Sequence, residues 1–289
     1  EETQENAPLG LGQKDQAEAF LDFNGNFAVN CADEQGKLNL NYFRSVGGSA
    51  VSTSLETNLY ESQKILLASF FSEKKFEPFF PEGRRQIQDL VKNIADWVDR
   101  NDRVNEGPGM EGGVEQSVYV GPEYTYSVKN ANMASLSELL LVKGMGDDIF
   151  QLAAPSLTVY GNDKINLCLA DEALVKAVIL QMGSQLQPPL RPDDEEKLNE
   201  VLKVVQETCQ SGSADPATLI RTMAAALGAT TGQDNSRALS TMQRMLTSGT
   251  RFYNLELTGS SGQIEIKIRA VLDTQGNPDQ WKMLYVRVE

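Results

Sequence analysis

The chain contains no histidine, which excludes Ser-His-Asp and Cys-His catalysis and any histidine-ligated zinc site. It has only three cysteines, Cys31, Cys168 and Cys209, and none lie in a Cys-x-x-Cys motif. This spacing argues against a zinc ribbon or a thioredoxin-type site and allows at most one internal disulfide. Three buried thiols are the alternative, because unpaired cysteine is among the most buried residue types. Carboxylate chemistry and binding of hard cations by oxygen remain open.

The chain also lacks a run of basic residues. It has 26 Lys and Arg against 40 Asp and Glu, which gives a formal net charge of −14 at pH 7. Such a chain repels nucleic-acid phosphates and anionic membrane surfaces. Long apolar runs are missing as well, since no stretch approaches the roughly 20 residues of a membrane-spanning helix. Nucleic acid is therefore not an expected partner.

The hydrophobic pattern changes period twice along the 289 residues. Phe27 and Val29 alternate with other residues as in a strand, helical spacing follows, and the last forty residues return to alternation. Strands are predicted at 252–257, 264–272 and 281–288. We predict an α+β fold in which one domain, residues 1–50 and 248–289, is interrupted by a helical domain, residues 51–247. Two consecutive domains would leave the first strand unpaired.

The strongest predicted helix of the insertion covers residues 84–98. Its apolar residues recur at helical spacing and form one stripe: Ile87, Leu90, Val91, Ile94, Trp97 and Val98. Residues 135–138 (Ser-Leu-Ser-Glu) form a capping box, and Gly144 and Gly146 allow a turn into a helix at 147–153. This helix-hairpin-helix-like unit carries one lysine, Lys143, which favours a structural role over phosphate binding. Further helices are predicted at 61–71, 171–181, 194–210, 216–227 and 235–246.

An acidic loop follows the helix at 84–98 and is the main candidate site. Its oxygen-bearing side chains are Asp96, Asp99, Asn101, Asp102, Glu106, Glu111 and Glu115. Calcium takes six to eight oxygen ligands from flexible loops, so this loop could bind it. The loop is not an EF-hand, because Arg103 replaces the third ligand. A solvated acidic loop at the end of a helix is the alternative that the residues alone leave open.

Four segments occur in the order found in the K-type minor pseudopilins of the type II secretion system (general secretion pathway protein K). They are residues 95–99 (Ala-Asp-Trp-Val-Asp), 113–119 (Gly-Val-Glu-Gln-Ser-Val-Tyr), 135–144 (Ser-Leu-Ser-Glu-Leu-Leu-Leu-Val-Lys-Gly) and 157–167, which contains Leu-Thr-Val-Tyr-Gly and Lys-Ile-Asn-Leu. Residues 23–30 are similar to the first strand of that family. The chain thus resembles this family over most of residues 20–180.

The resemblance implies a pilin-like domain, with an N-terminal helix and a small antiparallel sheet, and a helical insertion that binds calcium. It implies a non-enzymatic protein at the tip of the periplasmic pseudopilus, bound to the I-type and J-type pseudopilins, that helps to initiate assembly. It also implies an anchor helix in the inner membrane of a Gram-negative bacterium. That anchor is not in this sequence, and residues 13–21 are expected to be the end of its helix.

The chain departs from the family at three positions that bear on its sites. Asn101 stands where the family has the second Asp of an Asp-x-Asp pattern, and Gln116 stands where an acid follows the Glu. Asp99 and Glu115 are therefore the strongest predicted ligands, and the others are Asp96, Asn101, Asp102 and Glu111. Cys168 replaces a family Asn, which suggests a disulfide with Cys209 in an oxidising periplasm.

Two other classes of function remain as alternatives. A helix-hairpin-helix nucleic-acid module would need the basic surface that the chain lacks. A carboxylate-based glycan hydrolase, with a pair such as Asp96 and Asp99, would need two acids facing each other across a cleft. It would also need at least one of the two with a raised pKa.

Overall fold

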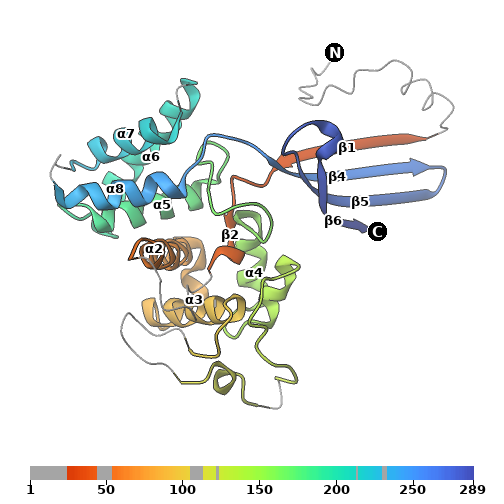
Figure 1. Cartoon of the computed structure of the whole chain (residues 1–289), viewed down its shortest axis with the longest axis horizontal. Helices are drawn as coiled ribbons and strands as arrows, with labels where there is room; N and C mark the ends of the chain where they lie inside the picture. The colour runs from red at the N-terminus through yellow and green to blue at the C-terminus, as the bar shows by residue number, and fades with distance from the viewer. Residues whose placement is uncertain (1–24, 44–53, 105–112, 122–123, 213, 230–232) are drawn as a thin grey trace.

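Strands from both ends of the chain pair into one antiparallel sheet (Figure 1). The structure is a computed structural model that describes residues 25–43, 54–104, 113–121, 124–212, 214–229 and 233–289. β1 (Asn26–Asp33) pairs with β4 (Phe252–Ser261), which continues to β5 (Ile264–Asp273) and β6 (Lys282–Val288) in the order β1-β4-β5-β6. The prediction that the first strand joins the C-terminal strands is therefore correct.

The helical body is formed by the residues between β1 and β4 (Figure 1). Its α-helices are α2 (Ser54–Phe71), α3 (Arg84–Val98), α4 (Asp147–Ala153), α5 (Glu172–Gln185), α6 (Glu195–Gln210), α7 (Pro216–Ala226) and α8 (Gln233–Met245). Short 3-10 helices are η1 (Leu40–Tyr42), η2 (Lys74–Phe79), η3 (Glu115–Val118), η4 (Leu136–Leu141) and η5 (Ala154–Ser156), and η6 (Pro278–Gln280) lies between β5 and β6. Within the described residues, no helix is long and apolar enough to cross a bilayer.

Two of the helices show how the sequence determines their packing. All six residues of the α3 stripe are buried, as their spacing predicts. α5 is apolar on most sides and lies against α2, α6 and α8, so it forms the centre of the body. The predicted hairpin begins with a capping box at Ser135 and Glu138, but its first helix, η4, is a 3-10 helix rather than an α-helix.

One short pairing was not foreseen from the sequence. β2 (Leu38–Asn39) pairs in parallel with β3 (Leu157–Thr158). This pairing draws Leu38, Leu40 and Phe43 into the core of the helical body, although the sequence assigned them to the sheet domain. The chain therefore leaves the sheet at Asp33, well before the predicted domain boundary at residue 50.

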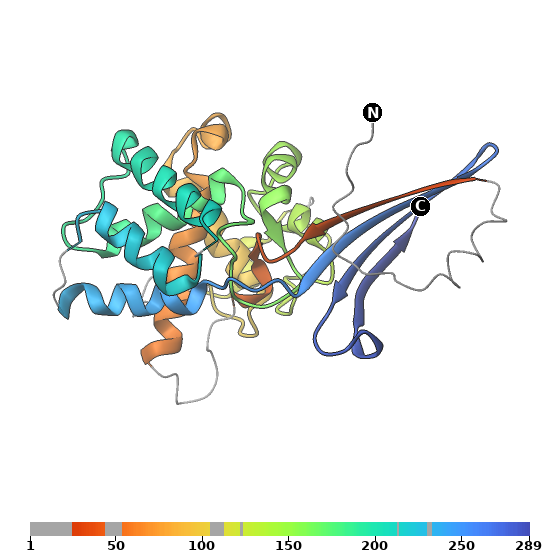
Figure 2. The ribbon, with the colours of Figure 1, turned by 90° about the horizontal axis from the view of Figure 1, so that it is seen from above.

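The sheet stands beside the helical body, and its strands run away from it (Figure 2). At the junction the amide of Glu34 donates a hydrogen bond to the carbonyl of Phe252 (2.9 Å). Gly161, at φ +97°, approaches the Phe252 ring so closely that a Cβ would come within 3.3 Å of it. The carboxylate of Asp273 pairs with Arg251 through two hydrogen bonds of 2.6 and 2.7 Å. These contacts join the two connecting segments to each other, to the sheet through Asp273 and to the helical body through Gly161.

The two faces of the sheet differ in polarity. Cross-strand pairing places Asn30, Glu256, Arg269 and Arg287 in one row of the polar face, where Arg269 and Glu256 form an ion pair (3.4 Å). The apolar face consists of Phe27, Val29, Cys31, Leu255, Leu257, Ile264, Ile266, Ile268, Ala270, Leu272, Met283, Val286 and Val288. Phe27 and Ile264 are both 67% exposed and Val288 is 64% exposed. Large apolar side chains exposed together mark an interaction surface.

A disulfide between Cys168 and Cys209, which are 41 residues apart, links the loop before α5 to the end of α6. The same loop is held near the junction, because the amide of Asn166 donates to the carbonyl of Gln35 (2.7 Å). The third cysteine, Cys31, is a half-buried free thiol on the apolar face. The pairing of Cys168 with Cys209 leaves Cys31 as the one thiol of the chain.

Gln181, in the middle of α5, is a built-in weakness of the helical core. Its side chain is fully buried, and neither its Oε1 nor its Nε2 has a hydrogen-bond partner among the described residues. A buried polar group without a partner costs about 1–3 kcal/mol.

Gln181→Met, which keeps the length of the side chain, is expected to raise the free energy of unfolding by that amount in urea titration. Gln185→Met, one turn further at a half-buried position, is the control and should change it by less than about 0.5 kcal/mol. A decrease for Gln181→Met would contradict this account.

Candidate metal centre

Two acids enter the core at the end of α3. The last turns of this helix are buried on all sides, from Ile94 to Val98, so Asp96 is carried into the interior with its apolar neighbours. The helix ends at Asp99, whose amide donates to the carbonyl of Ala95 (3.0 Å) while its own backbone turns to an extended conformation. Asp96 is 1% exposed and Asp99 is fully buried.

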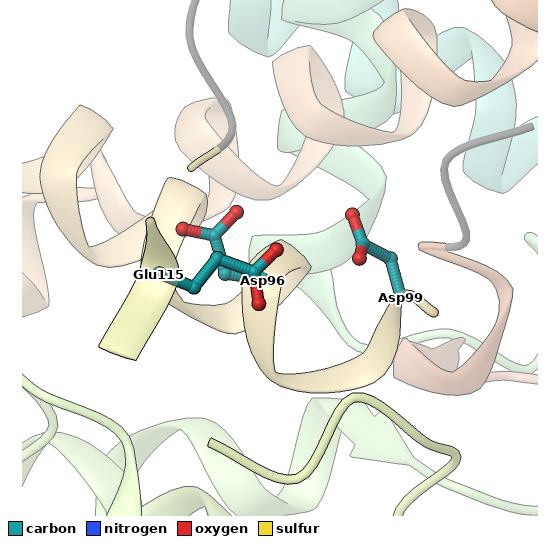
Figure 3. A group of neighbouring side chains, drawn as sticks. All are labelled: Asp96, Asp99 and Glu115. Atoms are coloured by element: carbon teal, nitrogen blue, oxygen red, sulfur yellow. The ribbon is translucent and has the colours of Figure 1, made fainter. Parts of the chain in front are cut away.

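A third acid arrives through a backbone pairing that brings the loop back on itself. The amide of Val104 donates to the carbonyl of Gly113 (2.9 Å), and the amide of Glu115 donates to the carbonyl of Asp102 (3.1 Å). Glu115 is thereby placed at the start of η3, beside the end of α3, and is 1% exposed. Asp96, Asp99 and Glu115 each offer an oxygen within 4.8 Å of the other two (Figure 3).

The electrostatics of this cluster call for a positive charge. Neither carboxylate oxygen of Glu115 accepts a hydrogen bond of good geometry from the described residues. Burial, together with the negative charges of Asp99, Asp96 and Asp102, raises the pKa of Glu115 to about 9. Burying a carboxylate without a partner is costly, and a hard cation with oxygen ligands would remove that cost. The residues therefore fit a divalent cation, which would be held by Asp96, Asp99 and Glu115.

The other predicted ligands lie beside the cluster or outside the described residues. Asn101 is half-buried, and its Oδ1 accepts from the amide of Arg103 (2.8 Å). Asp102 is exposed and does not belong to the group of mutually close carboxylates, although its charge reaches Glu115. Asp102 thus lies outside the group of three, whereas the prediction that Asn101 is a ligand stays a prediction. Glu111 and Glu106 fall in residues 105–112, outside the described part of the chain.

Asn130 is a site residue that sequence reasoning missed. Its Nδ2 donates to the carbonyl of Asn101 (3.0 Å) and to Oδ1 of Asp102 (2.8 Å). The structure gives it a positive φ of 48°, a conformation that Asn adopts more readily than most residues. Nothing in the spacing of the sequence links it to the acidic loop.

The hairpin at 135–153 contacts the segments that carry the acidic cluster, which favours a structural role over binding of a nucleic acid. Nε1 of Trp97 donates to Glu138 (3.5 Å), and Glu138 also pairs with Lys129 (2.7 Å). Nζ of Lys143, the lysine expected to bind phosphate in a nucleic-acid hairpin, donates to the carbonyl of Val118 (3.0 Å). Lys143 thus holds the end of η3 in place, which agrees with the structural role predicted for the hairpin.

The burial of Asp96 and Asp99 also weighs against a glycan hydrolase. With exposures of 1% and 0%, neither carboxylate can meet a sugar ring in a cleft. The two acids of such enzymes flank a scissile bond, with room between them for the substrate. Buried carboxylates that lie close enough together to bind one cation suit a metal site instead.

The sheet made from both ends of the chain, with helices inserted between its strands, defines a pilin-like α+β protein with a helical insertion. Residues 36–162 match the sequence model of the family described as "Type II secretion system (T2SS), protein K". The matched residues contain most of the segments that carry the resemblance, so the match bears out the resemblance to protein K over this part of the chain. No curated protein matches the chain in sequence.

A solved structure has the same fold. It is a chain of the GspK-GspI-GspJ complex from the type 2 secretion system of enterotoxigenic Escherichia coli, which is 15% identical in sequence. The match covers 92% of this chain and 80% of that one, with a TM-score of 0.58. The predicted α+β fold with a helical insertion is therefore confirmed.

Proposed function

We propose that this protein is a minor pseudopilin of a bacterial type II secretion system, placed at the tip of the periplasmic pseudopilus and helping to start its assembly. The protein K family match over residues 36–162 is the observation that carries the proposal. Figure 1 shows a helical body larger than the sheet and placed to one side of it, which in our proposal leaves no room for the body to repeat along a filament packed through the sheets. A subunit of this shape fits the end of the filament, with no enzymatic role.

Its partners are the I-type and J-type pseudopilins, and the apolar face is part of the surface where they bind. A GspK-GspI-GspJ complex is the source of the structure with the same fold. The exposed apolar side chains on one side of the sheet supply a surface of the kind that protein partners cover. A subunit that binds through its sheet keeps the helical body outside the filament.

Size-exclusion chromatography with light scattering tests this assembly. The protein mixed with soluble I-type and J-type pseudopilins at micromolar concentration is expected to elute as one complex with the summed mass. Ile266→Asp, on the apolar face, should weaken the complex, while the matched Lys267→Asp on the polar face should not. Separate elution of the three wild-type proteins would contradict the proposal.

We further propose that the full-length protein is anchored at the periplasmic face of the inner membrane by a hydrophobic N-terminal helix, as the family resemblance implies. Fractionation of cells that express the full-length protein tests this. The protein should stay with inner membranes after an alkaline carbonate wash, and release by the wash would contradict the anchor.

The cation at the cluster is proposed to be calcium, held by Asp96, Asp99 and Glu115. Calcium takes oxygen ligands and tolerates irregular geometry, so three carboxylates from a helix end and a loop suit it. Its charge would offset the repulsion between the buried acids and join η3 to the end of α3. The cation thus braces the inserted body and takes part in no reaction.

Calcium affinity is expected to rise with pH between about 5 and 9. The folded, metal-free protein holds Glu115 with a pKa of about 9, above the ordinary value of 4.5, so this group binds a proton that calcium must displace. For the same reason, the metal-free protein loses stability through Glu115 as pH rises from about 4.5 toward 9. Calorimetric titration at pH 7 in buffers of different ionisation enthalpy should show release of close to one proton per calcium. Binding without proton release would contradict the protonated state of Glu115.

A further inference from the structure

Asn130 connects the acidic loop to the rigid part of the helical body. Its Nδ2 donates to the carbonyl of Asn101 (3.0 Å) and to Oδ1 of Asp102 (2.8 Å). Both acceptors belong to the loop between the two halves of the carboxylate cluster, because Asp99 precedes them and the backbone of Asp102 binds the amide of Glu115 (3.1 Å). The side chain of Asn130 therefore joins the local hydrogen bonds of Asn101 and Arg103 in holding the turn between the end of α3 and Glu115.

The conformation of Asn130 is unfavourable by itself, so other interactions must stabilise it. Its φ is +48°, and within the described residues it is the one non-glycine residue with a positive φ. Its Oδ1 is buried and has no hydrogen-bond partner there, which costs free energy. Such a conformation persists only when its surroundings require it, and it concentrates at functional sites. In this conformation Nδ2 makes its two hydrogen bonds to Asn101 and Asp102, and the side chain also lies near enough to Glu115 to lower its pKa.

The segment that follows Asn130 is itself fixed. The amide of Met133 donates to Oδ1 of Asn41 (2.7 Å), and Nδ2 of Asn41 donates to the carbonyls of Met133 (2.9 Å) and Val159 (2.8 Å). Met133 and Asn41 are both buried. Asn130 therefore lies three residues before a segment that is fixed to Asn41 and Val159, next to the strand pair β2 and β3. Its side chain connects this fixed segment to the loop that follows Asp99.

We infer that Asn130 is a positioning residue for the cation site: it acts through Asn101 and Asp102 to hold the acidic loop in the conformation that brings Glu115 to Asp96 and Asp99. This inference rests on the proposed calcium site. An amide suits the role because it donates hydrogen bonds without adding charge beside a cluster of three acids, Asp96, Asp99 and Glu115, which already lies near a fourth, Asp102. An aspartate at position 130 would add a further negative charge and lose both donors.

Calcium titration of Asn130→Gly by isothermal calorimetry tests the inference. Glycine adopts the positive φ without strain, so the variant removes the side chain while keeping the backbone. We expect calcium Kd to rise about 10-fold to 100-fold, as is typical when a residue supporting a metal ligand is lost. The Tm of the metal-free variant should change little. An unchanged Kd, with or without a lower metal-free Tm, would overturn the inference, because a residue with a merely structural role affects folding alone.

A double-mutant cycle with Asp102→Ala shows whether Asn130 acts through that residue. The double variant is expected to bind calcium no more weakly than the worse of the two single variants, since both remove the same contact. Fully multiplicative losses would overturn the proposed route through Asp102. The wild-type titration separates this inference from the proposed calcium site: no wild-type binding overturns both, whereas wild-type binding with an unaffected Asn130→Gly overturns the inference alone.

Discussion

Glu115→Gln is expected to abolish the stabilisation of the protein by calcium and, at the same time, to raise the Tm of the metal-free protein. Glutamine keeps the size of the side chain but removes its charge. Without metal, the change relieves a buried carboxylate that is repelled by Asp99 and Asp96 and that must take up a proton to fold at neutral pH. With metal, the site loses one of its three carboxylates, so most of the affinity is lost.

The size of the calcium effect follows from mass action. At a hundredfold excess over its Kd, calcium stabilises the wild-type protein by about 2.7 kcal/mol. A change of that size corresponds to roughly 5–10 °C in Tm for a domain of this length. Thermal unfolding with chelator and with calcium should show this shift for the wild type and almost none for Glu115→Gln.

Asp89→Asn, on the exposed side of α3, is the matched control for Glu115→Gln because it makes the same kind of change on the neighbouring helix. It should keep the full calcium response and the wild-type metal-free Tm. A Glu115→Gln protein that still gains several degrees with calcium would contradict the assignment of Glu115 as a ligand. A lower metal-free Tm would contradict the account of its buried charge.

Replacing both disulfide cysteines, as Cys168→Ser/Cys209→Ser, is expected to lower the free energy of unfolding by about 2–4 kcal/mol. The bond closes a loop with a sequence separation of 41, so it restricts the unfolded chain considerably. It also ties the end of α6 to the loop that binds Gln35 beside the sheet. The corresponding fall in Tm is roughly 5–15 °C, measured by circular dichroism under non-reducing conditions.

Two comparisons isolate the disulfide in that experiment. Cys31→Ser removes the free thiol and should change Tm far less, because Cys31 has no covalent partner. Reductant should lower the Tm of the wild type toward that of the double variant and leave the double variant unchanged. Equal Tm values for the wild type and the double variant would show that the bond does not form or does not stabilise the fold.

The parts of the fold with strong local periodicity could be predicted from sequence. The stripe of α3 is predictable because burial on one side of a helix repeats every three to four residues. The alternation at 264–272 is predictable because successive side chains of a strand point to opposite faces of the sheet, and one of these faces is apolar. The pairing of β2 with β3 has no such signal. Each strand has two residues, and more than a hundred residues separate Leu38 from Leu157.

The sequence pointed to Asp96, Asp99 and Glu115, which the structure brings together, but it could not show that Asp102 lies outside this group. Composition alone made Asp102 look equivalent to Asp99, whereas the folded loop leaves Asp102 exposed and outside the group of three carboxylates. Asn130 could not be found at all, since its role depends on a contact between segments 28 and 29 residues apart. Local patterns identify which residues can bind a cation, and only the folded loop shows which of them meet.

The reactivity of the Cys31 thiol tests the central proposal most directly. Cys31 is the free cysteine, and it lies on the apolar face, where its cross-strand partner is Leu255 and Val29 is its neighbour along β1. Maleimide labelling should proceed for the protein alone and slow at least tenfold after the I-type and J-type pseudopilins are added, with the protein co-eluting with both. An unchanged labelling rate in a co-eluting complex would contradict binding through this face. No complex and no protection would contradict the minor pseudopilin function itself.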